Sequence, residues 1–162
     1  MEIIEYREEF EEDCKDLLVE LEEYIVSIDN DNLDQVGNEY REKMLRHDLD
    51  EINKYNGICY LAIENNKAIG LIMGCLREWD EYDFLDYKCP KTGMITELIV
   101  SKQTRSNGVG KELMRKMEKY LKSKGCEYIT IEVFAYNKNA EIFYNKRGYH
   151  TRMHELIKKV EE

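Results

Sequence analysis

The chain contains the stretch Glu97-Leu98-Ile99-Val100-Ser101-Lys102-Gln103-Thr104-Arg105-Ser106-Asn107-Gly108-Val109-Gly110-Lys111, an apolar segment followed by a polar turn and a segment of helical periodicity. These features predict a buried strand, a turn and an amphipathic helix. Glycine accepts unusual backbone angles, so successive N–H groups of the turn can converge on one anion. The helix dipole, Arg105 and Lys111 add positive charge. We therefore predict a diphosphate site here. The alternative is a glycine-softened turn that only starts a helix.

Two common nucleotide-binding motifs do not fit this turn. A Walker loop needs glycine where the chain has Arg105, and serine or threonine where it has Glu112. A Rossmann fingerprint that begins at Gly108 needs glycine or alanine where the chain has Leu113. The spacing excludes both motifs.

The rest of the chain alternates between strand and helix patterns. Strands are predicted at Met1–Tyr6, Ile58–Ile63, Ala68–Leu76, Met94–Val100, Tyr128–Ala135 and Tyr149–Val160. Helices are predicted over residues 10–28, 39–55, 108–124 and 138–146. Asn65-Asn66 favours a tight hairpin, because asparagine tolerates positive φ. The order β-α-α-β-β-β-α-β-α-β predicts an α/β sandwich around a mixed sheet, in one domain over residues 1–162.

Charge and hydropathy limit the partners of this chain. It has 34 acidic and 24 basic residues, a formal net charge of −10, which argues against nucleic acid as a partner. The acidity suits a cationic amine substrate, or it serves solubility alone. No apolar run approaches the roughly 18 residues of a membrane span, and the N-terminus has no signal pattern. We expect a cytoplasmic protein with no membrane partner.

The cysteines do not predict a disulfide framework or a metal site. The five are scattered without a CxxC pair, and the three histidines form no zinc-ligand spacing with them. We expect reduced cysteines in or near the core.

A second informative segment is Asn137-Lys138-Asn139-Ala140-Glu141-Ile142-Phe143-Tyr144-Asn145-Lys146-Arg147-Gly148-Tyr149. On a helix, positions 137, 140 and 144 lie on one face. Asn137 is a good cap for the start of this helix, and Gly148 is a good residue to end it. Taken alone, the segment also fits an ordinary amphipathic helix packed by its apolar side chains.

Together the two segments resemble the signatures of the GNAT acetyltransferase superfamily. Arg105, Gly108 and Gly110 occupy the defining positions of its acyl-CoA motif R/Q-x-x-G-x-G/A. Residues 137–149 resemble its motif N-x-x-A-x-x-x-Y-x-x-x-G-F/Y. The resemblance implies a GNAT-type mixed β-sheet flanked by helices on both faces. It also implies an N-acetyltransferase that moves an acetyl group from acetyl-CoA to a primary amine, on a small cationic molecule or on a peptide or protein.

The resemblance also implies which residues meet the cofactor. Backbone amides of the turn hold the CoA pyrophosphate in this family, the preceding strand hydrogen-bonds the pantetheine arm, and the second motif lines the passage of that arm. The residues implied are Leu98, Ile99, Val100, Arg105, Ser106, Asn107, Gly108, Val109, Gly110, Lys111, Asn137, Ala140 and Tyr144.

The implied reaction is direct attack of a neutral amine on the thioester. Tyr144 is the expected acid for the thiolate, since a phenol and a thiol have comparable acidity. The Val100 backbone N–H is the expected oxyanion donor. No cysteine stands where a covalent acyl-enzyme would need it.

Two glutamates compete for the role of base. Glu132 lies twelve residues before Tyr144, a spacing that resembles bacterial N-terminal acetyltransferases acting on ribosomal protein, and a solvated glutamate is the alternative. Other family members carry a glutamate at positions that hold Thr96 or Met94 here. Glu97 has the opposite strand parity, which favours a structural role for it.

The acceptor is less constrained by sequence. The segment Trp79-Asp80-Glu81-Tyr82-Asp83-Phe84-Leu85-Asp86-Tyr87 could bind a cationic amine beside the cleft, or it is an exposed loop with anchoring aromatics. The other functions left open are a non-catalytic CoA-binding regulator and an acyltransferase for longer acyl groups. A homodimer is also left open.

Overall fold

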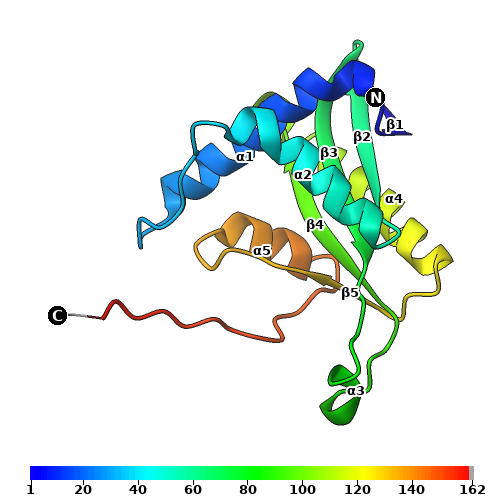
Figure 1. The fold of residues 1–162 in the computed structure, drawn as a ribbon. Coiled ribbons are helices and arrows are strands. Elements are labelled where there is room, and N and C mark those ends of the chain that lie inside the picture. Colours follow the sequence, from blue (N-terminus) through cyan, green and yellow to red (C-terminus); the bar gives the residue numbers. More distant parts are fainter. Residues whose placement is uncertain (161–162) are drawn as a thin grey trace. The chain divides into compact units, whose positions relative to one another are not determined.

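Five strands form one mixed sheet in the order β1-β2-β3-β4-β5 in the computed structural model, which describes residues 1–160 (Figure 1). The strands are β1 (Glu2–Glu5), β2 (Ile58–Glu64), β3 (Lys67–Leu76), β4 (Thr92–Val100) and β5 (Tyr128–Ile131). Strands β1 to β4 pair antiparallel, and β5 joins β4 in parallel. The predicted mixed sheet is confirmed.

The helices fall into two compact parts of the chain. They are α1 (Glu11–Ile28), α2 (Tyr40–Lys54), α3 (Asp83–Asp86), α4 (Val109–Ser123) and α5 (Lys138–Asn145), with 3-10 turns at Glu8–Phe10 and Lys102–Thr104. Residues 1–132 form the part that contains the sheet and α1 to α4, and a smaller part that contains α5 begins at Val133. In the first part, helices cover both faces of the sheet, as predicted. The prediction of one domain over residues 1–162 stays a prediction.

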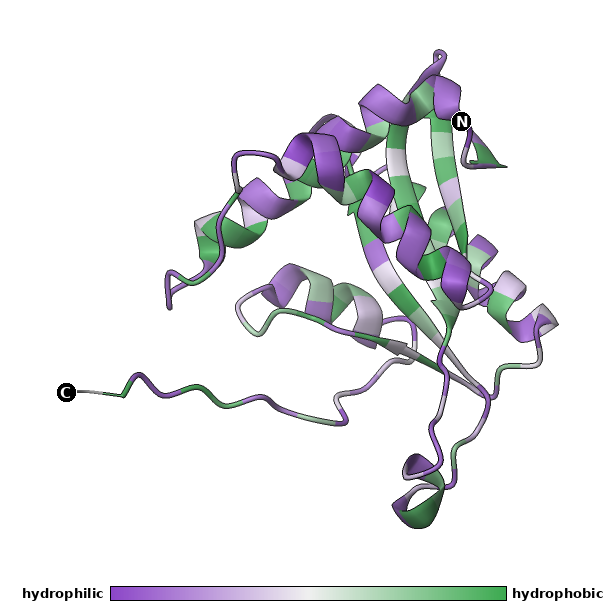
Figure 2. Cartoon of the chain, viewed as in Figure 1, coloured by the Kyte–Doolittle hydropathy of each residue, from purple (hydrophilic) through white to green (hydrophobic). Residues whose placement is uncertain are grey.

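One face of the sheet carries the main apolar core under α1 and α2. Alternate residues of β2 and β3, such as Leu61 and Leu71, are fully buried against Leu18 of α1 and Leu45 of α2. Burying one such side chain contributes about 1.5–3 kcal/mol, so this layer supplies a large share of the stability. Figure 2 shows long hydrophobic runs on β2 and β3, and hydrophilic residues spread along α1 and α2.

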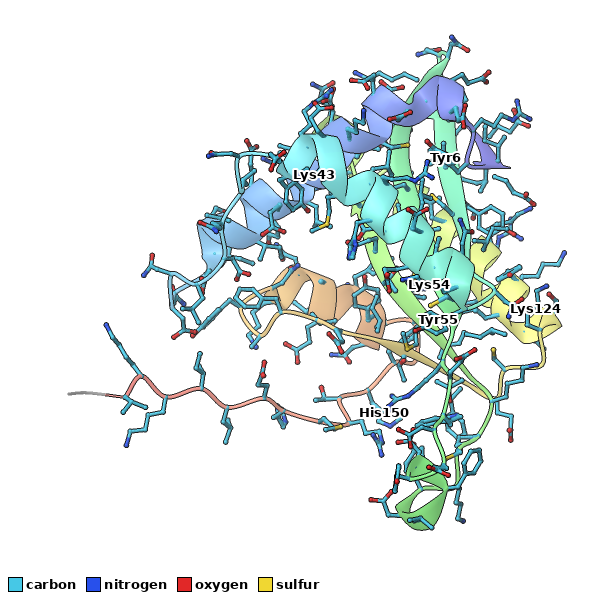
Figure 3. The ribbon with its side chains drawn as sticks, viewed as in Figure 1. Tyr6, Lys43, Lys54, Tyr55, Lys124 and His150 are labelled. Carbon is cyan, nitrogen blue, oxygen red and sulfur yellow. The ribbon has the colours of Figure 1, made fainter. Side chains whose placement is uncertain are left out.

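The end of α2 is tied to the sheet through Tyr55, which is labelled in Figure 3. The Tyr55 carbonyl oxygen accepts a hydrogen bond of 2.9 Å from the Leu76 N–H at the end of β3. The Tyr55 side chain also packs against the core. This contact fixes where α2 ends relative to β3.

The opposite face of the sheet is lined with glycines where α4 crosses it. A Cβ atom added at Gly70, Gly74 or Gly93 would lie within 3.2 Å of side chains of α4. The contacted side chains are Leu113, Met117 and Leu121, which recur every four residues along one face of the helix. Helix α4 therefore approaches the backbone of β3 and β4 closely.

The hairpin between β2 and β3 follows its predicted turn. Asn65 and Asn66 both adopt positive φ, 51° and 58°. Two consecutive residues with positive φ define the type I′ turn, whose twist matches that of the flanking strands.

The predicted last strand, Tyr149–Val160, is wrong. Residues 149–160 contain no strand, and Met153, Leu156 and Val160 are exposed. A strand exists only where a neighbour accepts its backbone hydrogen bonds, and apolar alternation cannot supply that neighbour. The preceding strand is also shorter than predicted, since pairing of β5 with β4 ends at Ile131.

No helix in the described part of the chain is long and apolar enough to span a membrane.

We expect Gly74→Ala to lower the free energy of unfolding by about 1–3 kcal/mol. The added Cβ would lie 2.8 Å from the Met94 carbonyl oxygen and 2.9 Å from Met117 Sδ, so backbone or helix must shift. Gly37→Ala is the matched control, because a Cβ there meets nothing within 4 Å. Urea unfolding curves measure both. Equal urea midpoints for the two variants would show that the contact between α4 and the sheet can accommodate the added methyl group.

Candidate active site

The turn between β4 and α4 has the backbone geometry of an anion site. Ser106 and Gly108 adopt positive φ, 72° and 81°, and α4 begins at the next residue, Val109. A side chain at Gly108 would meet no atom within 4 Å, so the backbone angle rather than lack of space favours glycine there. The first N–H groups of α4 have no partner within the helix. They and the helix dipole make a site for a phosphate.

Arg105 fixes the turn in place. Its Nε donates a hydrogen bond of 3.0 Å to the Val100 carbonyl oxygen, and its guanidinium lies 3.6 Å from Glu20 of α1. The guanidinium also lies 5.6 Å from the ring centroid of Tyr24. The Glu20 carboxylate also accepts a hydrogen bond of 2.6 Å from the Lys102 N–H. Arg105 therefore holds the turn against α1 although its side chain is itself exposed, as are those of Asn107 and Lys111.

Glu20 is a residue that the sequence motifs do not predict. It lies 82 residues from Lys102, and one more glutamate on an acidic helix carries no local signal. Only the tertiary structure brings this carboxylate to the turn.

In the described part of the chain, no strand pairs with the outer edge of the second half of β4, where the Val100 carbonyl oxygen accepts from Arg105 Nε. The Ser101 N–H donates to the Ile69 carbonyl oxygen on the β3 side, and in an antiparallel ladder alternate residues point their backbone groups to opposite sides. The backbone N–H and C=O groups of Leu98 and Val100 therefore point away from β3. Pairing between β4 and β5 stops at Ile95. An extended ligand can hydrogen-bond to such an edge.

A bulge in β4 changes which way Glu97 points. Met73 of β3 pairs with Glu97 and Gly74 pairs with Ile95, so Thr96 has no partner in the ladder. The extra residue places Glu97 on the same face of the sheet as Met73, the face under α1 and α2. The predicted opposite parity of Glu97 is therefore wrong, because the bulge breaks the alternation of side chains along the strand.

Glu97 lies among other acidic groups. Burial, followed by the charges of Asp48 on α2 and Glu22 on α1, raises the pKa of Glu97 to about 8. Burial also raises the pKa of Asp48 to about 6. The Tyr40 hydroxyl donates a hydrogen bond to the Glu22 carboxylate. With this pKa, Glu97 is mostly protonated at neutral pH and ionises toward pH 8.

The second motif forms a capped helix in the smaller part of the chain. The Asn137 side-chain oxygen accepts a hydrogen bond of 3.1 Å from the Ala140 N–H at the start of α5, which confirms the predicted cap. Gly148 has φ 91° after the end of the helix. Tyr144 is 8% exposed, and its ring contacts the ring of Tyr149 at a centroid distance of 5.8 Å.

The remaining predicted groups have simpler surroundings. Glu132 follows the last residue of β5 and is exposed. Ile99 and Val109 are buried, so these two side chains serve packing.

Burial raises the pKa of the Cys14 thiol to about 12 and that of Cys59 well above its ordinary range, which suppresses the nucleophilic thiolate. In the described part of the chain, no cluster of three or more histidine, cysteine or acidic side chains could hold a metal.

Comparison with known proteins identifies relatives along most of the chain. The sequence profile of the acetyltransferase (GNAT) family matches residues 11–149. N-alpha-acetyltransferase MAK3 of Arabidopsis thaliana is 29% identical over 92 residues, which are 57% of this chain and 44% of that protein. An uncharacterized N-acetyltransferase of Methanocaldococcus jannaschii is 30% identical over 99 residues, 60% of this chain and 56% of that protein. The matches thus span about half the length of these two relatives.

Solved structures support the same fold. A mutant of the BH1408 protein of Bacillus halodurans superposes with a TM-score of 0.78 at 18% identity, and the alignment covers 99% of both chains. At this identity the likeness concerns the fold alone.

We expect the free energy of unfolding to decrease as the pH rises from about 5 to about 8, because the pKa of Glu97 is about 8 in the folded state and near 4.5 in the unfolded state. In this window the folded state binds more protons than the unfolded state, so raising the pH favours unfolding. Glu97→Gln removes this loss. At pH 8 the variant should exceed the wild type by a few kcal/mol at most, on the order of 1.4 kcal/mol per unit of pKa shift.

Glu132→Gln is the control for this experiment, since that side chain is exposed. Urea unfolding at pH 5 and pH 8 gives the comparison. The same change in stability with pH for wild type and Glu97→Gln would contradict the raised pKa.

Proposed function

The chain belongs to the acetyltransferase (GNAT) family, and on this premise we propose that it transfers an acetyl group from acetyl-CoA directly to a primary amine. The observation that carries the proposal is the outer edge of β4 at Leu98 and Val100, which leads into the positive-φ turn at the start of α4. An extended arm with a diphosphate at one end fits such an edge and turn.

The proposed cofactor contacts use mainly backbone groups. The pyrophosphate binds to amides of residues 106–111 at the N-terminus of α4, and the pantetheine arm pairs with the backbone of Leu98. Arg105 keeps the turn in shape through its bonds to the Val100 carbonyl and Glu20. Asn137, Ala140 and Tyr144 are proposed to line the same arm, as the family resemblance implies.

Glu97 is the proposed base. A protonated amine is drawn to the carboxylates of Glu22 and Asp48. Its proton passes to the ionised form of Glu97, whose share grows as the pH approaches the pKa of about 8. The neutral nitrogen then attacks the thioester carbonyl carbon. The Val100 N–H stabilises the oxyanion that develops on the carbonyl oxygen.

Collapse of the tetrahedral intermediate breaks the C–S bond and releases CoA. Tyr144 is the proposed acid that gives the leaving thiolate its proton, and the second amine proton departs to water, because Glu97 already holds the first. Exchange with solvent then returns a proton to Tyr144 and removes one from Glu97. Each acetyl group transferred thus yields one amide and one CoA thiol. Glu132 is the alternative base, because its spacing from Tyr144 matches the bacterial enzymes mentioned above.

The pocket next to Glu22, Asp48 and Glu97 favours an acceptor with an apolar part. A cavity of about 490 Å³ is lined by residues at the start of α2, and Tyr40 belongs both to this cavity and to the surroundings of Glu97. The lining residues are Gly37, Glu39, Tyr40, Lys43, Met44 and His47. We therefore propose an amine beside an apolar group, such as the N-terminus of a peptide, over a small polyamine. The N-alpha-acetyltransferase among the relatives is consistent with this choice.

Calorimetric titration with acetyl-CoA tests the cofactor site. We expect micromolar binding by the wild type and a loss of at least about tenfold in the double variant Gly108→Glu, Gly110→Glu, because two carboxylates would face the diphosphate. Asn30→Glu with Asn38→Glu is the control, an equal charge change in an exposed loop. No binding by folded wild type would rule out the proposal. Binding of acetyl-CoA without release of CoA in the presence of any amine would favour a non-catalytic CoA-binding module. Tighter binding of a longer acyl-CoA would favour an acyltransferase for longer acyl groups.

Replacement of each candidate base distinguishes Glu97 from Glu132. We expect Glu97→Gln to lower kcat by about 100-fold or more and to remove the rise of the wild-type rate toward pH 8. Glu132→Gln should retain both the rate and its pH profile. CoA release on a peptide amine, followed from pH 6 to about pH 9, measures these effects. The reverse pattern would assign the role to Glu132.

A further inference from the structure

The segment between β3 and β4 forms a projection with an exposed apolar tip. Helix α3 lies on this projection, beyond the ends of the two strands (Figure 1). Tyr82, Phe84 and Leu85 are 70%, 62% and 81% exposed. Figure 2 shows hydrophobic residues of α3 at this end of the molecule. Large side chains gathered on one exposed element are typical of a contact surface.

The tip is also acidic. Residues 80–86 contain four acidic residues, no basic residue, and the three exposed apolar side chains. We call residues 80–86 the acidic tip. Its charge repels phosphate-rich partners, such as nucleic acid and anionic membranes. A second copy of this chain is also disfavoured, because two identical acidic tips repel and each chain carries a net charge of −10.

Hydrogen bonds within the tip hold its backbone in one conformation. Asp80 accepts from the N–H groups of Tyr82 and Asp83, and Asp83 accepts from the N–H of Asp80. These bonds, each between 2.8 and 2.9 Å, occupy only two of the acidic side chains. A surface that is already ordered loses little conformational entropy when it binds.

The base of the projection is packed as well. The Trp79 ring contacts the Arg77 guanidinium, 4.1 Å from the ring centroid, and the Tyr87 ring, whose centroid is 5.0 Å away. The Trp79 Nε1–H donates a 3.0 Å hydrogen bond to the Pro90 carbonyl oxygen. Trp79 is the only tryptophan of the chain, so its fluorescence reports on this segment alone.

The projection is remote from the proposed cofactor turn. It joins the chain before Thr92, at the start of β4, whereas the turn follows Val100, at the end of that strand. A strand of this length spans roughly 25–30 Å. This distance concerns the diphosphate turn alone, so the interpretation of this segment as a wall of the acceptor cleft stays a prediction.

We infer that the acidic tip is a docking surface for a protein segment rich in arginine or lysine and interspersed with apolar residues. Basic side chains pair with Glu81 and Asp86 and stack on Tyr82 and Phe84, while apolar side chains cover Leu85. Long-range attraction to the acidic chain assists the encounter. This docking is separate from acetyl transfer, and it does not require that the proposed function be correct.

The experiment uses a peptide that cannot be an acetyl acceptor. A synthetic peptide of alternating arginine and leucine, blocked at both ends, has no amine. It is titrated into the full chain while Trp79 fluorescence is followed. We expect saturable binding on the order of 10 µM that weakens with salt, and no response to the matched peptide with glutamate in place of arginine.

Three variants locate the binding surface. Phe84→Ser with Leu85→Ser, and Glu81→Lys with Asp86→Lys, should each weaken binding about tenfold, because they remove the apolar and the acidic contacts separately. Glu2→Lys with Glu23→Lys gives the same change of net charge at exposed positions elsewhere and should leave binding within about twofold.

Two results would overturn the proposal. An equal loss in the control would mean that binding follows net charge rather than the tip. A wild type that self-associates in sedimentation, with Phe84→Ser and Leu85→Ser monomeric, would make the tip a contact between copies of the chain. Acetyl-CoA binding, measured in parallel, should be unchanged in all three variants. Failure of the docking proposal is thus distinguishable from failure of the proposed function.

Discussion

The rest of the site depends on the extra residue at Thr96 of β4. It breaks the alternation of the strand, so Glu97 lies under α1 and α2 while Leu98 and Val100 keep their backbone groups at the edge. Pairing with β5 ends just before the bulge, at Ile95. Bulges bend a strand and terminate pairing, and here both effects occur at the point where a ligand edge and a half-buried carboxylate meet.

The close contact between α4 and the sheet gives this edge its anion site. Glycines on β3 and β4 let the helix lie against the backbone, which fixes the axis of α4 and therefore the position of its first turn. Arg105 and Glu20 then tie the turn to α1, on the opposite face of the sheet. The turn is thus held from both layers of the fold, which limits its reorganisation when an anion binds.

Acidic residues serve this chain in two physical settings. Glu97 and Asp48 are desolvated, and their raised pKa values record a cost in stability that the protein bears near neutral pH. A functional group often carries such a cost, because the same desolvation tunes it for proton transfer. The acidic tip, by contrast, remains in water, where its charges cost little and act at long range. The net charge of −10 alone does not distinguish the two settings.

The sequence by itself determined the order of the central strands and helices, the Asn65-Asn66 turn, the helix caps at Asn137 and Gly148, and the motif that identifies the family. These features depend on local backbone preferences and on apolar periodicity, which act over a few residues and are therefore visible in a single chain.

Tertiary structure decided the rest. The side of the sheet that Glu97 occupies depends on a bulge, which is a mismatch between two strands. The contact of Glu20 with the turn joins residues 82 positions apart, and the raised pKa of Glu97 requires α1 and α2 to exclude water above it. The expected last strand is missing for the same reason, since residues 149–160 have the alternation of a strand but no neighbour to pair with. Pairing, burial and charge proximity arise only between segments, so no local pattern contains them.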